Sequence, residues 1–379
     1  MSCRLLADFD PFGWLRAAFA STSRSAETLS KTLIPSLPTS QYAFAAIAWL
    51  LVGSCSVFGQ AAPTKVTVGN LSIATDAAIF IADAKGYFAA EGLDVSLSTF
   101  RSASYMVPLL GTGQLDVGAG SPSAAFYNAI LRGVKIRIVA DKSYSPPGYG
   151  SLSLLIRKDL VDEGRVKTLR DLKGLKLAMT ASGVVNTATL NTALKSVGLG
   201  YDDVEIINLP FASHPVALQN KAVDGAVTVE PYVTMMAERG IAVSFKRDDE
   251  IDPNHQLGCL FFSEAFATEH HDAAVRFLRA YIKGVRFYNL ALRDGRLAGD
   301  NADEVIDILA KYTALKDATL LRRTTPAGLH PDGRVNSDSL QRDFDFYASQ
   351  GLVLGRLAVK DIVDESLLNA ALRSLATRR

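Results

Sequence analysis

The residues best suited to chemistry in this sequence lie where predicted strands run directly into predicted helices. Residues 180–187 (TASGVVNT) form such a turn after an apolar run. Ser182, Asn186 and Thr187 offer hydroxyl and amide groups, and a helix start adds unpaired backbone N–H groups and the positive end of its dipole. With Gly183, these groups can hold a carboxylate, sulfonate or nitrate. The alternative is ordinary helix capping, but the turn is longer than a cap needs, which favours ligand contact.

Four further candidate residues occupy similar turns. Glu230 ends the apolar run 225–229, and Thr75 and Asp76 follow the first predicted strand. Either carboxylate could accept hydrogen bonds from an amine or ring N–H of a ligand, or complement a helix dipole, and both interpretations stay open. Two acids aimed at one pocket would argue against a simple inorganic anion. Ser121 lies in GAGSPS, which lacks the Gly-x-Ser-x-Gly elbow of a nucleophile, so we interpret it as a capping residue whose turn also touches the ligand.

Catalytic, metal and nucleic-acid functions find little support. None of the five histidines has zinc-ligand spacing. The net charge is +1, without a basic stripe of the kind that nucleic acid requires. We therefore expect a non-enzyme with no metal, no cofactor and no nucleic-acid partner. Aromatic residues near the same strand ends either wall a pocket or belong to the core: Phe80, Tyr105, Tyr144, Phe211 and Tyr232.

Residues 1–62 are typical of an export leader. A Ser/Thr/Pro-rich lead-in with scattered basic residues precedes the apolar run 42–58, and small residues follow it. The run is marginal for a membrane span, so an uncleaved anchor is the alternative. Residues 52–55 (VGSC) resemble a lipobox, which would lipidate Cys55. We favour plain cleavage near Ala61, and either route predicts a periplasmic location.

Strand and helix signals alternate from residue 65 onward, which predicts α/β units with largely parallel sheets. The breaker cluster 145–150 (SPPGYG) separates two such series. Extended apolar segments near 152–158 and 255–260 would cross between two lobes and act as hinges. The predicted division is a leader at 1–62, the first lobe at 63–155, the second lobe at 156–256, and a return to the first lobe at 257–379.

Two helix starts are predicted from capping residues. Ser121 followed by Pro122 would open a helix that ends at Gly133. Ser337 would cap a helix in the helical C-terminal extension, with Gly351 as its stop.

Several short motifs resemble the solute-binding proteins of ABC importers for sulfonates, taurine, nitrate and thiamine-pyrimidine precursors. Their order and spacing carry the resemblance over about residues 65–290. The motifs are KGYF at 85–88, EGLDV at 91–95, LDVG at 115–118, DLKGLKL at 171–177, GL at 198–199 with DV at 203–204, and VDGA at 223–226 before Glu230-Pro231.

The resemblance implies a type II periplasmic-binding-protein fold, with a small organic solute held between two hinged lobes. It also implies a monomer that delivers the solute to a permease in the inner membrane. The implied solute is sulfonate-, carboxylate- or pyrimidine-like. The family's ligand contacts fall on Thr75, Asp76, Ser121, Ser182, Gly183, Asn186, Thr187 and Glu230. The chain departs from a taurine-like site that uses tryptophan, because Trp14 and Trp49 both lie in the leader.

Two other classes remain open. One is an enzyme on the same fold, such as a thiamine-pyrimidine synthase or a menaquinone-pathway relative. The export leader, and the lack of a Lys/His/Cys constellation, argue against it. The other is the effector-sensing domain of a transcription regulator, which would need a helix-turn-helix segment before residue 65.

Overall fold

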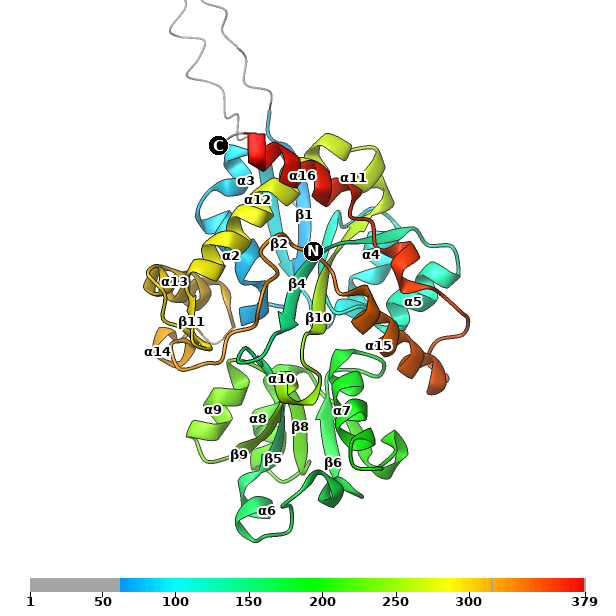
Figure 1. Ribbon diagram of the computed structural model, residues 1–379, viewed down its shortest axis with the longest axis vertical. Helices are drawn as coiled ribbons and strands as arrows, with labels where there is room; N and C mark the ends of the chain where they lie inside the picture. The colour runs from blue at the N-terminus through cyan, green and yellow to red at the C-terminus, as the bar shows by residue number, and fades with distance from the viewer. Residues whose placement is uncertain (1–61, 315, 378–379) are drawn as a thin grey trace, which may run out of the picture. The chain divides into compact units, whose positions relative to one another are not determined.

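A computed structural model describes residues 62–314 and 316–377 of the chain. The predicted cleavage near Ala61, the lipidation of Cys55 and the apolar run 42–58 therefore lie outside the described residues. Within them the chain forms two five-stranded mixed sheets, each flanked by helices in its own lobe (Figure 1).

The first lobe is built on a sheet with the strand order β2-β1-β3-β10-β4. Strands β1, β2 and β3 are parallel, and β10 is antiparallel to both of its neighbours. The strands are β1 (Thr64–Asn70), β2 (Leu93–Thr99), β3 (Val117–Gly120), β4 (Ile136–Ser145) and β10 (His255–Ser263).

The second lobe repeats this arrangement with the order β7-β6-β8-β5-β9. Here β5 is the strand that runs antiparallel to its two neighbours. The strands are β5 (Leu152–Arg157), β6 (Lys176–Met179), β7 (Glu205–Asn208), β8 (Gly225–Val229) and β9 (Ala242–Arg247). The fourth position in each sheet is taken by the first strand that forms after the chain enters that lobe from the other one, which is β10 in the first lobe and β5 in the second.

The chain changes lobes earlier than the sequence suggested at the first crossing. All of β5 belongs to the second sheet, so the change occurs between Ser145 and Leu152, in the Pro/Gly-rich segment, and not at 152–158. The return occurs between Arg247 and His255. The two crossing segments are joined by hydrogen bonds that Asp248 and Asp249 accept from the Leu152 and Gly148 amides at 3.1 and 2.8 Å.

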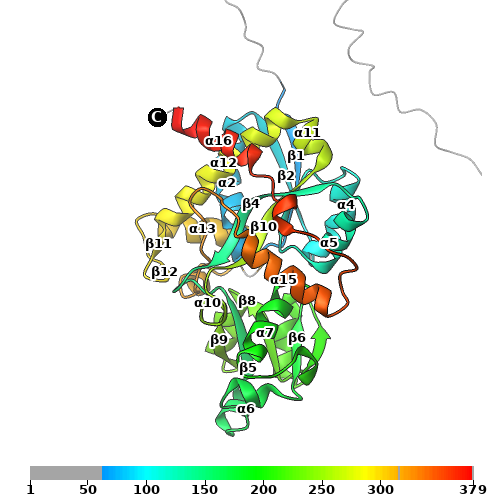
Figure 2. The ribbon, with the colours of Figure 1, turned by 45° about the vertical axis from the view of Figure 1, so that its right-hand side comes forward.

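The helices cover both faces of the first sheet, with α2, α12 and α16 on one side and α4, α5 and α15 on the other (Figures 1 and 2). The first lobe holds α2 (Ala77–Ala84), α3 (Tyr87–Ala90), α4 (Val107–Gly111), α5 (Ala124–Leu131), α11 (Glu264–Thr268), α12 (His271–Leu290), α13 (Ala302–Tyr312), α14 (Ala318–Leu321), α15 (Ser337–Ser349) and α16 (Ser366–Thr377), and a short hairpin of β11 (Leu292–Arg293) and β12 (Arg296–Leu297). The second lobe holds α6 (Lys158–Asp162), α7 (Val185–Lys195), α8 (His214–Gln219), α9 (Tyr232–Glu238) and α10 (Asp248–Ile251).

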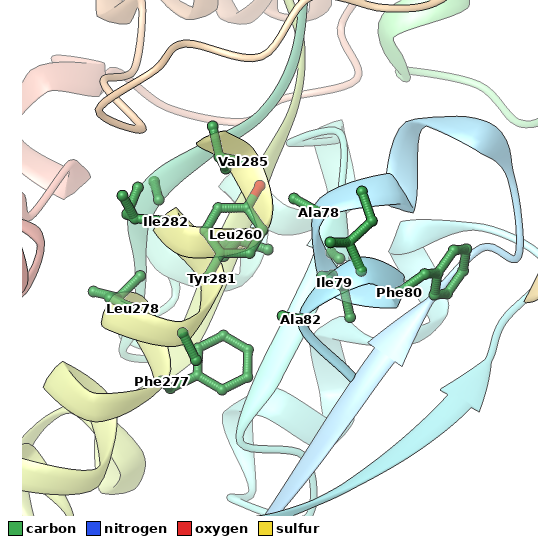
Figure 3. Packing of buried hydrophobic residues seen from close by; sticks show 14 of the residues in the cluster. Ala78, Ile79, Phe80, Ala82, Leu260, Phe277, Leu278, Tyr281, Ile282 and Val285 are labelled. Atoms are coloured by element: carbon green, nitrogen blue, oxygen red, sulfur yellow. The ribbon is translucent and has the colours of Figure 1, made fainter. Parts of the chain in front are cut away.

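The largest core cluster lies between the first sheet and the helices α2 and α12 (Figure 3). Tyr281, Ile282 and Val285 form part of a buried stripe along α12. Gly284 lets the two helices approach closely, because a Cβ there would lie 2.3 Å from the Ala78 carbonyl oxygen. This close packing against α12 fixes the position of α2, and with it the turn at Thr75 and Asp76 that precedes α2.

Two predicted caps were displaced by a short distance. Helix α5 begins at Ala124 and is capped by Ser123, whose hydroxyl accepts a hydrogen bond from the Phe126 amide at 3.2 Å. Ser121 and Pro122 both lie before the helix, so the cap falls two residues later than predicted. Helix α15 is capped by Asn336, not Ser337, and the Asn336 side chain accepts a hydrogen bond from the Ser339 amide.

Candidate functional site

A cavity with a free volume of about 50 Å³ lies between the two lobes, where strand ends of both sheets meet. From the first lobe it is lined by residues that follow β1, β2 and β3 or lie within β4. These include Thr75, Arg101, Ser102, Ser121, Lys142 and Ser143. From the second lobe it is lined by residues at the ends of β6, β7 and β8. These include Thr180, Val184, Val185, Asn186, Phe211 and Val229.

A buried ion pair forms part of the first-lobe wall. The Lys142 ammonium lies 2.8 Å from Oδ1 of Asp76, and their side chains are 3% and 0% exposed. Lys142 also donates a hydrogen bond to the Thr75 hydroxyl at 2.9 Å. Oδ2 of Asp76 accepts hydrogen bonds from the Leu71 and Ile73 amides, both at 3.1 Å. Asp76 therefore neutralises Lys142 and fixes the turn that carries Thr75.

Arg101 gives this wall its uncompensated charge. It follows β2, is exposed, and forms no ion pair with any residue of the described chain. Because Lys142 and Asp76 cancel, the charged side chains at the cavity sum to +1. A guanidinium binds carboxylate and sulfonate oxygens through paired hydrogen bonds.

The start of α7 supplies uncharged donors from the second lobe. Its N-cap residue is Val184, whose side chain cannot accept a hydrogen bond from the first turn. The amides of Val185 and Asn186, at the first two helical positions, have no carbonyl one turn back. Both residues line the cavity. The Asn186 side chain is fixed from behind, since it donates to the Val227 carbonyl at 2.7 Å.

The turn before α7 also touches the first lobe directly. The Ala124 amide at the start of α5 donates to the Gly183 carbonyl at 2.8 Å. Gly183 has φ = +63°, a conformation that disfavours other residues. A Cβ there would lie 2.5 Å from the Ala124 Cβ. The lobes are thus in contact beside the cavity, and the contact requires glycine.

Glu230 does not line the cavity. Its carboxylate is 3% exposed and accepts hydrogen bonds from the Thr234 amide, the Thr234 hydroxyl and the Thr325 amide at 3.0, 2.8 and 3.2 Å. Burial raises the pKa of Glu230 despite these donors. The bond to Thr325 ties the start of α9 to the segment after α14.

The structure brings only some of the predicted site residues to the cavity. Thr75, Ser121 and Asn186 line it, and Asp76 acts through Lys142. The Ser182 hydroxyl is exposed and accepts a bond from Asn208 at 3.3 Å. The Thr187 hydroxyl is buried and donates to the Val184 carbonyl at 2.6 Å. Gly183 contributes its lobe contact, and Glu230 lies apart.

Arg101 and Lys142 were not identified from the sequence. Both could have been, because Arg101 follows the alternating segment LDVSL at 93–97 and Lys142 follows the apolar run IRIVA at 136–140, which are strand signals. The rule that located Ser121 and Ser182, polar residues after strand ends, applies equally to these two. Among the aromatic residues, Phe211 lines the cavity, whereas Phe80 is core and Tyr105 is 63% exposed.

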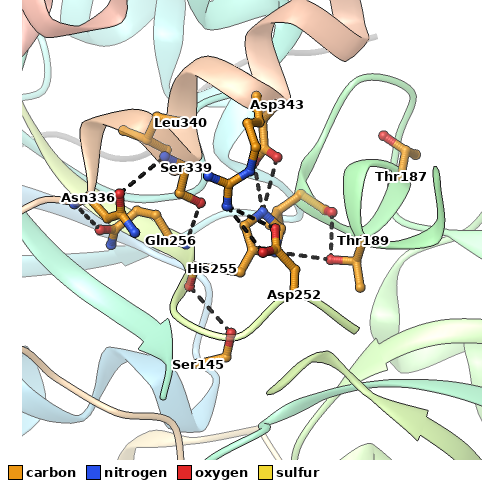
Figure 4. Close-up of polar contacts among 12 residues, drawn as sticks. Ser145, Thr187, Thr189, Asp252, His255, Gln256, Asn336, Ser339, Leu340 and Asp343 are labelled. Carbon is orange, nitrogen blue, oxygen red and sulfur yellow. Dashed lines mark hydrogen bonds and ion pairs between the residues drawn. The ribbon is translucent and has the colours of Figure 1, made fainter. Parts of the chain in front are cut away.

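A buried polar network joins the lobes at the second crossing (Figure 4). The His255 ring lies 3.0 Å from the Asp343 carboxylate on α15 and 3.4 Å from the Thr189 hydroxyl on α7. Burial lowers the pKa of His255, but the Asp343 carboxylate outweighs it and the net shift is upward. Helix α15 lies beside both α5 and α7 (Figure 2), so this network links one helix of the first lobe to the helix that opens onto the cavity.

Other potentially reactive groups, Cys259 and His214, are not among the described residues that line the cavity. Cys259 is buried in β10, and burial raises its pKa. Burial lowers the pKa of His214 to about 4. No group of three or more His, Cys, Asp or Glu side chains in residues 62–314 and 316–377 is arranged to hold a metal ion. None of the described helices has the length and apolarity to cross a membrane.

Two lobes with matching strand orders, joined by two crossings and enclosing a cavity at their strand ends, define the two-lobe fold of ABC solute-binding proteins. A solved example is the alkanesulfonate-binding protein SsuA of Xanthomonas axonopodis pv. citri bound to MOPS. The match covers 80% of this chain and 99% of that protein, with a TM-score of 0.64 and 17% sequence identity.

The chain belongs to the NMT1-like family, which matches residues 59–310. A putative aliphatic sulfonates-binding protein of Bacillus subtilis is 28% identical over 310 residues, covering 78% of this chain and 84% of that protein. An enzyme is also among the relatives. The 4-amino-5-hydroxymethyl-2-methylpyrimidine phosphate synthase of Aspergillus parasiticus is 25% identical, covering 57% of this chain and 63% of that protein.

Proposed function

We propose that this protein is the extracytoplasmic solute-binding component of an ABC importer, and that its cleft binds a small organic anion with a single negative charge. It would act as a periplasmic monomer, released by cleavage near Ala61 or anchored through Cys55, and would deliver the solute to an inner-membrane permease. The sulfonate-binding relatives support this class of ligand.

The observation that carries the proposal is the charge balance at the cavity. The Lys142–Asp76 pair is neutral, which leaves Arg101 as the one uncompensated charged side chain among the described lining residues. The hydroxyls of Thr75 and Ser121 and the uncapped start of α7 add neutral donors. A singly charged carboxylate or sulfonate matches this set of donors.

Ligand contacts from both walls would favour the closed arrangement of the lobes. Arg101 and Ser121 belong to the first lobe, and Asn186 belongs to the second. A ligand held by all three stabilises only the state in which they face one another. The Ala124–Gly183 hydrogen bond would form in that same state, while Ser182 and Thr187 support the turn that makes it.

An enzyme acting on a pyrimidine precursor is the second candidate, favoured by the synthase relative. Its chemistry would need a reactive side chain at the cavity. Lys142 lines the cavity but is bound by Asp76 and Thr75, while Cys259 and His214 are buried outside the lining. Recovery of the bound compound unchanged, checked by mass spectrometry, distinguishes binding from turnover.

The test is a thermal-shift and calorimetric screen of sulfonates and carboxylates against matched ammonium compounds. We expect anions alone to stabilise the protein and to reduce its radius in X-ray scattering. Arg101→Ala should weaken binding of each anion by about 10- to 100-fold, the loss of a charge-assisted hydrogen bond. Arg132→Ala, an exposed arginine at the end of α5 outside the lining, is the control. Binding of ammonium compounds, or an unchanged radius at saturation, would contradict the proposal.

A further inference from the structure

A second chamber opens beside the cavity described above. Its free volume is about 270 Å³, and its walls are mostly apolar. The two spaces share four lining residues, which are Leu71, Ile73, Arg101 and Phe211. We call the smaller space the head cavity and the larger one the tail chamber. Because these residues line both, the two spaces lie next to each other, with Arg101 at their boundary.

The head cavity is too small to hold an organic molecule by itself. At about 50 Å³ it has room for only a few water-sized groups, since one water needs about 10–15 Å³ measured in this way. The tail chamber is larger than an apolar cavity of about 150 Å³ that binds benzene in another protein. Together the two spaces approach the size of an ordinary small-molecule site.

Aromatic side chains from both lobes form the tail chamber. Phe100 comes from the first lobe, and Phe211 and Tyr232 come from the second. The Phe211 ring packs edge-on against His214, with centroids 5.7 Å apart and planes at 69°. Burial holds the pKa of His214 at about 4, so the imidazole is neutral near pH 7 and adds no charge beside the chamber.

The wall between the two spaces is held by the same carboxylate that neutralises Lys142. Oδ2 of Asp76 accepts hydrogen bonds from the amides of Leu71 and Ile73, the two shared apolar residues. Arg101 is the only charged side chain among the described residues that line the tail chamber, and it lies at the shared boundary. The arrangement is a charged point next to an aromatic compartment.

We propose that the tail chamber holds the apolar tail of the solute, about the size of one aromatic ring, while its anionic group lies at Arg101 in the head cavity. The ligand class is thus an aryl-bearing monoanion and not an inorganic or one-carbon anion. This inference rests on the proposed function, because it assigns a second part to the same ligand. The tail is recognised by burial of apolar surface against Phe100, Phe211 and Tyr232.

The experiment compares probes that share a head and differ only in the tail. Benzenesulfonate is titrated against methanesulfonate, and benzoate against acetate, by calorimetry with the wild-type protein. We expect the aryl member of at least one pair to bind tighter by about tenfold or more, from burial of one apolar ring. Equal affinities within both pairs would overturn the tail assignment and leave the anion site intact.

Two variants change the tail chamber in opposite ways. Phe100→Ala removes a wall, and Ala212→Trp adds bulk at an exposed position; both residues line the tail chamber and not the head cavity. Each should weaken the aryl probe more than its short partner, while Tyr105→Ala, which alters an exposed aromatic residue outside both spaces, should not. If neither variant changes the ratio of the two affinities, the assignment is wrong. If no probe binds, the proposed anion site is wrong and the tail assignment is wrong with it.

Discussion

The two walls of the head cavity differ in kind. The first lobe contributes every charged lining side chain, Arg101 and Lys142, and also the buried Asp76 behind them. The second lobe contributes amides, hydroxyls and apolar groups, and its one predicted acid, Glu230, is used elsewhere. Under the proposed function, the first lobe would select the ligand's charge and the second lobe would close onto it.

This division has a physical basis. A charged wall keeps its full attraction for an anion only if it is rigid. The Lys142–Asp76 ion pair is held by three further hydrogen bonds, which involve Thr75, Leu71 and Ile73. A closing wall gains from neutral groups, because burying them against the ligand desolvates no further charge. Variants that remove the charged pair of the first lobe, or alter the neutral groups of the second, test this difference between the two walls.

The largest effect is expected from Lys142→Met. It leaves the Asp76 carboxylate buried without its counter-ion and should lower the free energy of unfolding by about 3–5 kcal/mol. Urea denaturation measures the loss. Lys195→Met, at an exposed position on α7, serves as the control. The double variant with Asp76→Asn should recover part of the loss, since it removes the stranded charge; a single variant as stable as the control would show that the pair is unimportant.

A smaller effect, but on closure, is expected from Gly183→Ala. The residue has φ = +63°, and its new Cβ would meet the Ala124 Cβ at 2.5 Å across the lobes. We expect a loss of about tenfold or more in anion affinity and a weaker compaction in scattering, because the steric conflict exists only when the lobes are together.

Gly198→Ala is the matched control for that experiment. Gly198 has φ = +80° just after α7, but a Cβ there would meet nothing within 4 Å. Both variants suffer the left-handed backbone cost of about 1–2 kcal/mol. Only Gly183→Ala should reduce affinity, and equal affinities for the two variants would mean that the lobe contact plays no part in closure.

The smallest effect concerns Glu230, the acid of the second lobe that does not face the ligand. Three groups donate hydrogen bonds to the Glu230 carboxylate. Glu230→Gln replaces one of its acceptor oxygens with an NH2 group, which cannot accept these bonds, and should lower the free energy of unfolding by about 1 kcal/mol. Because burial raises the pKa of Glu230, the folded state binds its proton more tightly than the unfolded state does. The wild-type protein should therefore lose stability as the pH rises above about 4.5, the ordinary pKa of a glutamate, and the Glu230→Gln variant should lose less.

Denaturation at a series of pH values from about 4 to 8 measures this difference, with Glu269→Gln, at an exposed position after α11, as the reference. A steeper fall in the variant than in the reference would contradict the raised pKa.

Much of the fold followed from the sequence because its signals are local. The alternation of apolar runs with Gly-terminated helices located most of the strands and the long helix α12. The short helices α6, α10 and α14 and the strand β9 were not predicted, since tertiary contacts rather than a long periodic pattern hold them. The first crossing was placed too late because β5 is mostly apolar and buried along its whole length, and such a strand fits either sheet.

The site was predicted less well than the fold, for a different reason. Strand ends indicate which turns face the cleft, but not which side chain in a turn reaches it. Glu230 and Thr187 have the same polar character as Thr75 and Asn186, yet they bond to their own helices. That Asp76 would be neutralised by Lys142, 66 residues further along the chain, depends on how β4 lies against the first turn.

The position of β10 has a consequence for how the chain assembles. The second sheet is made wholly from residues 152–247, one uninterrupted stretch. The first sheet cannot join β3 to β4 until β10, at His255–Ser263, is inserted between them. During synthesis from the N-terminus, the second lobe can therefore complete its sheet while the first still exposes two unpaired strand edges. The first lobe, although it starts nearer the N-terminus, therefore completes its sheet after the second lobe.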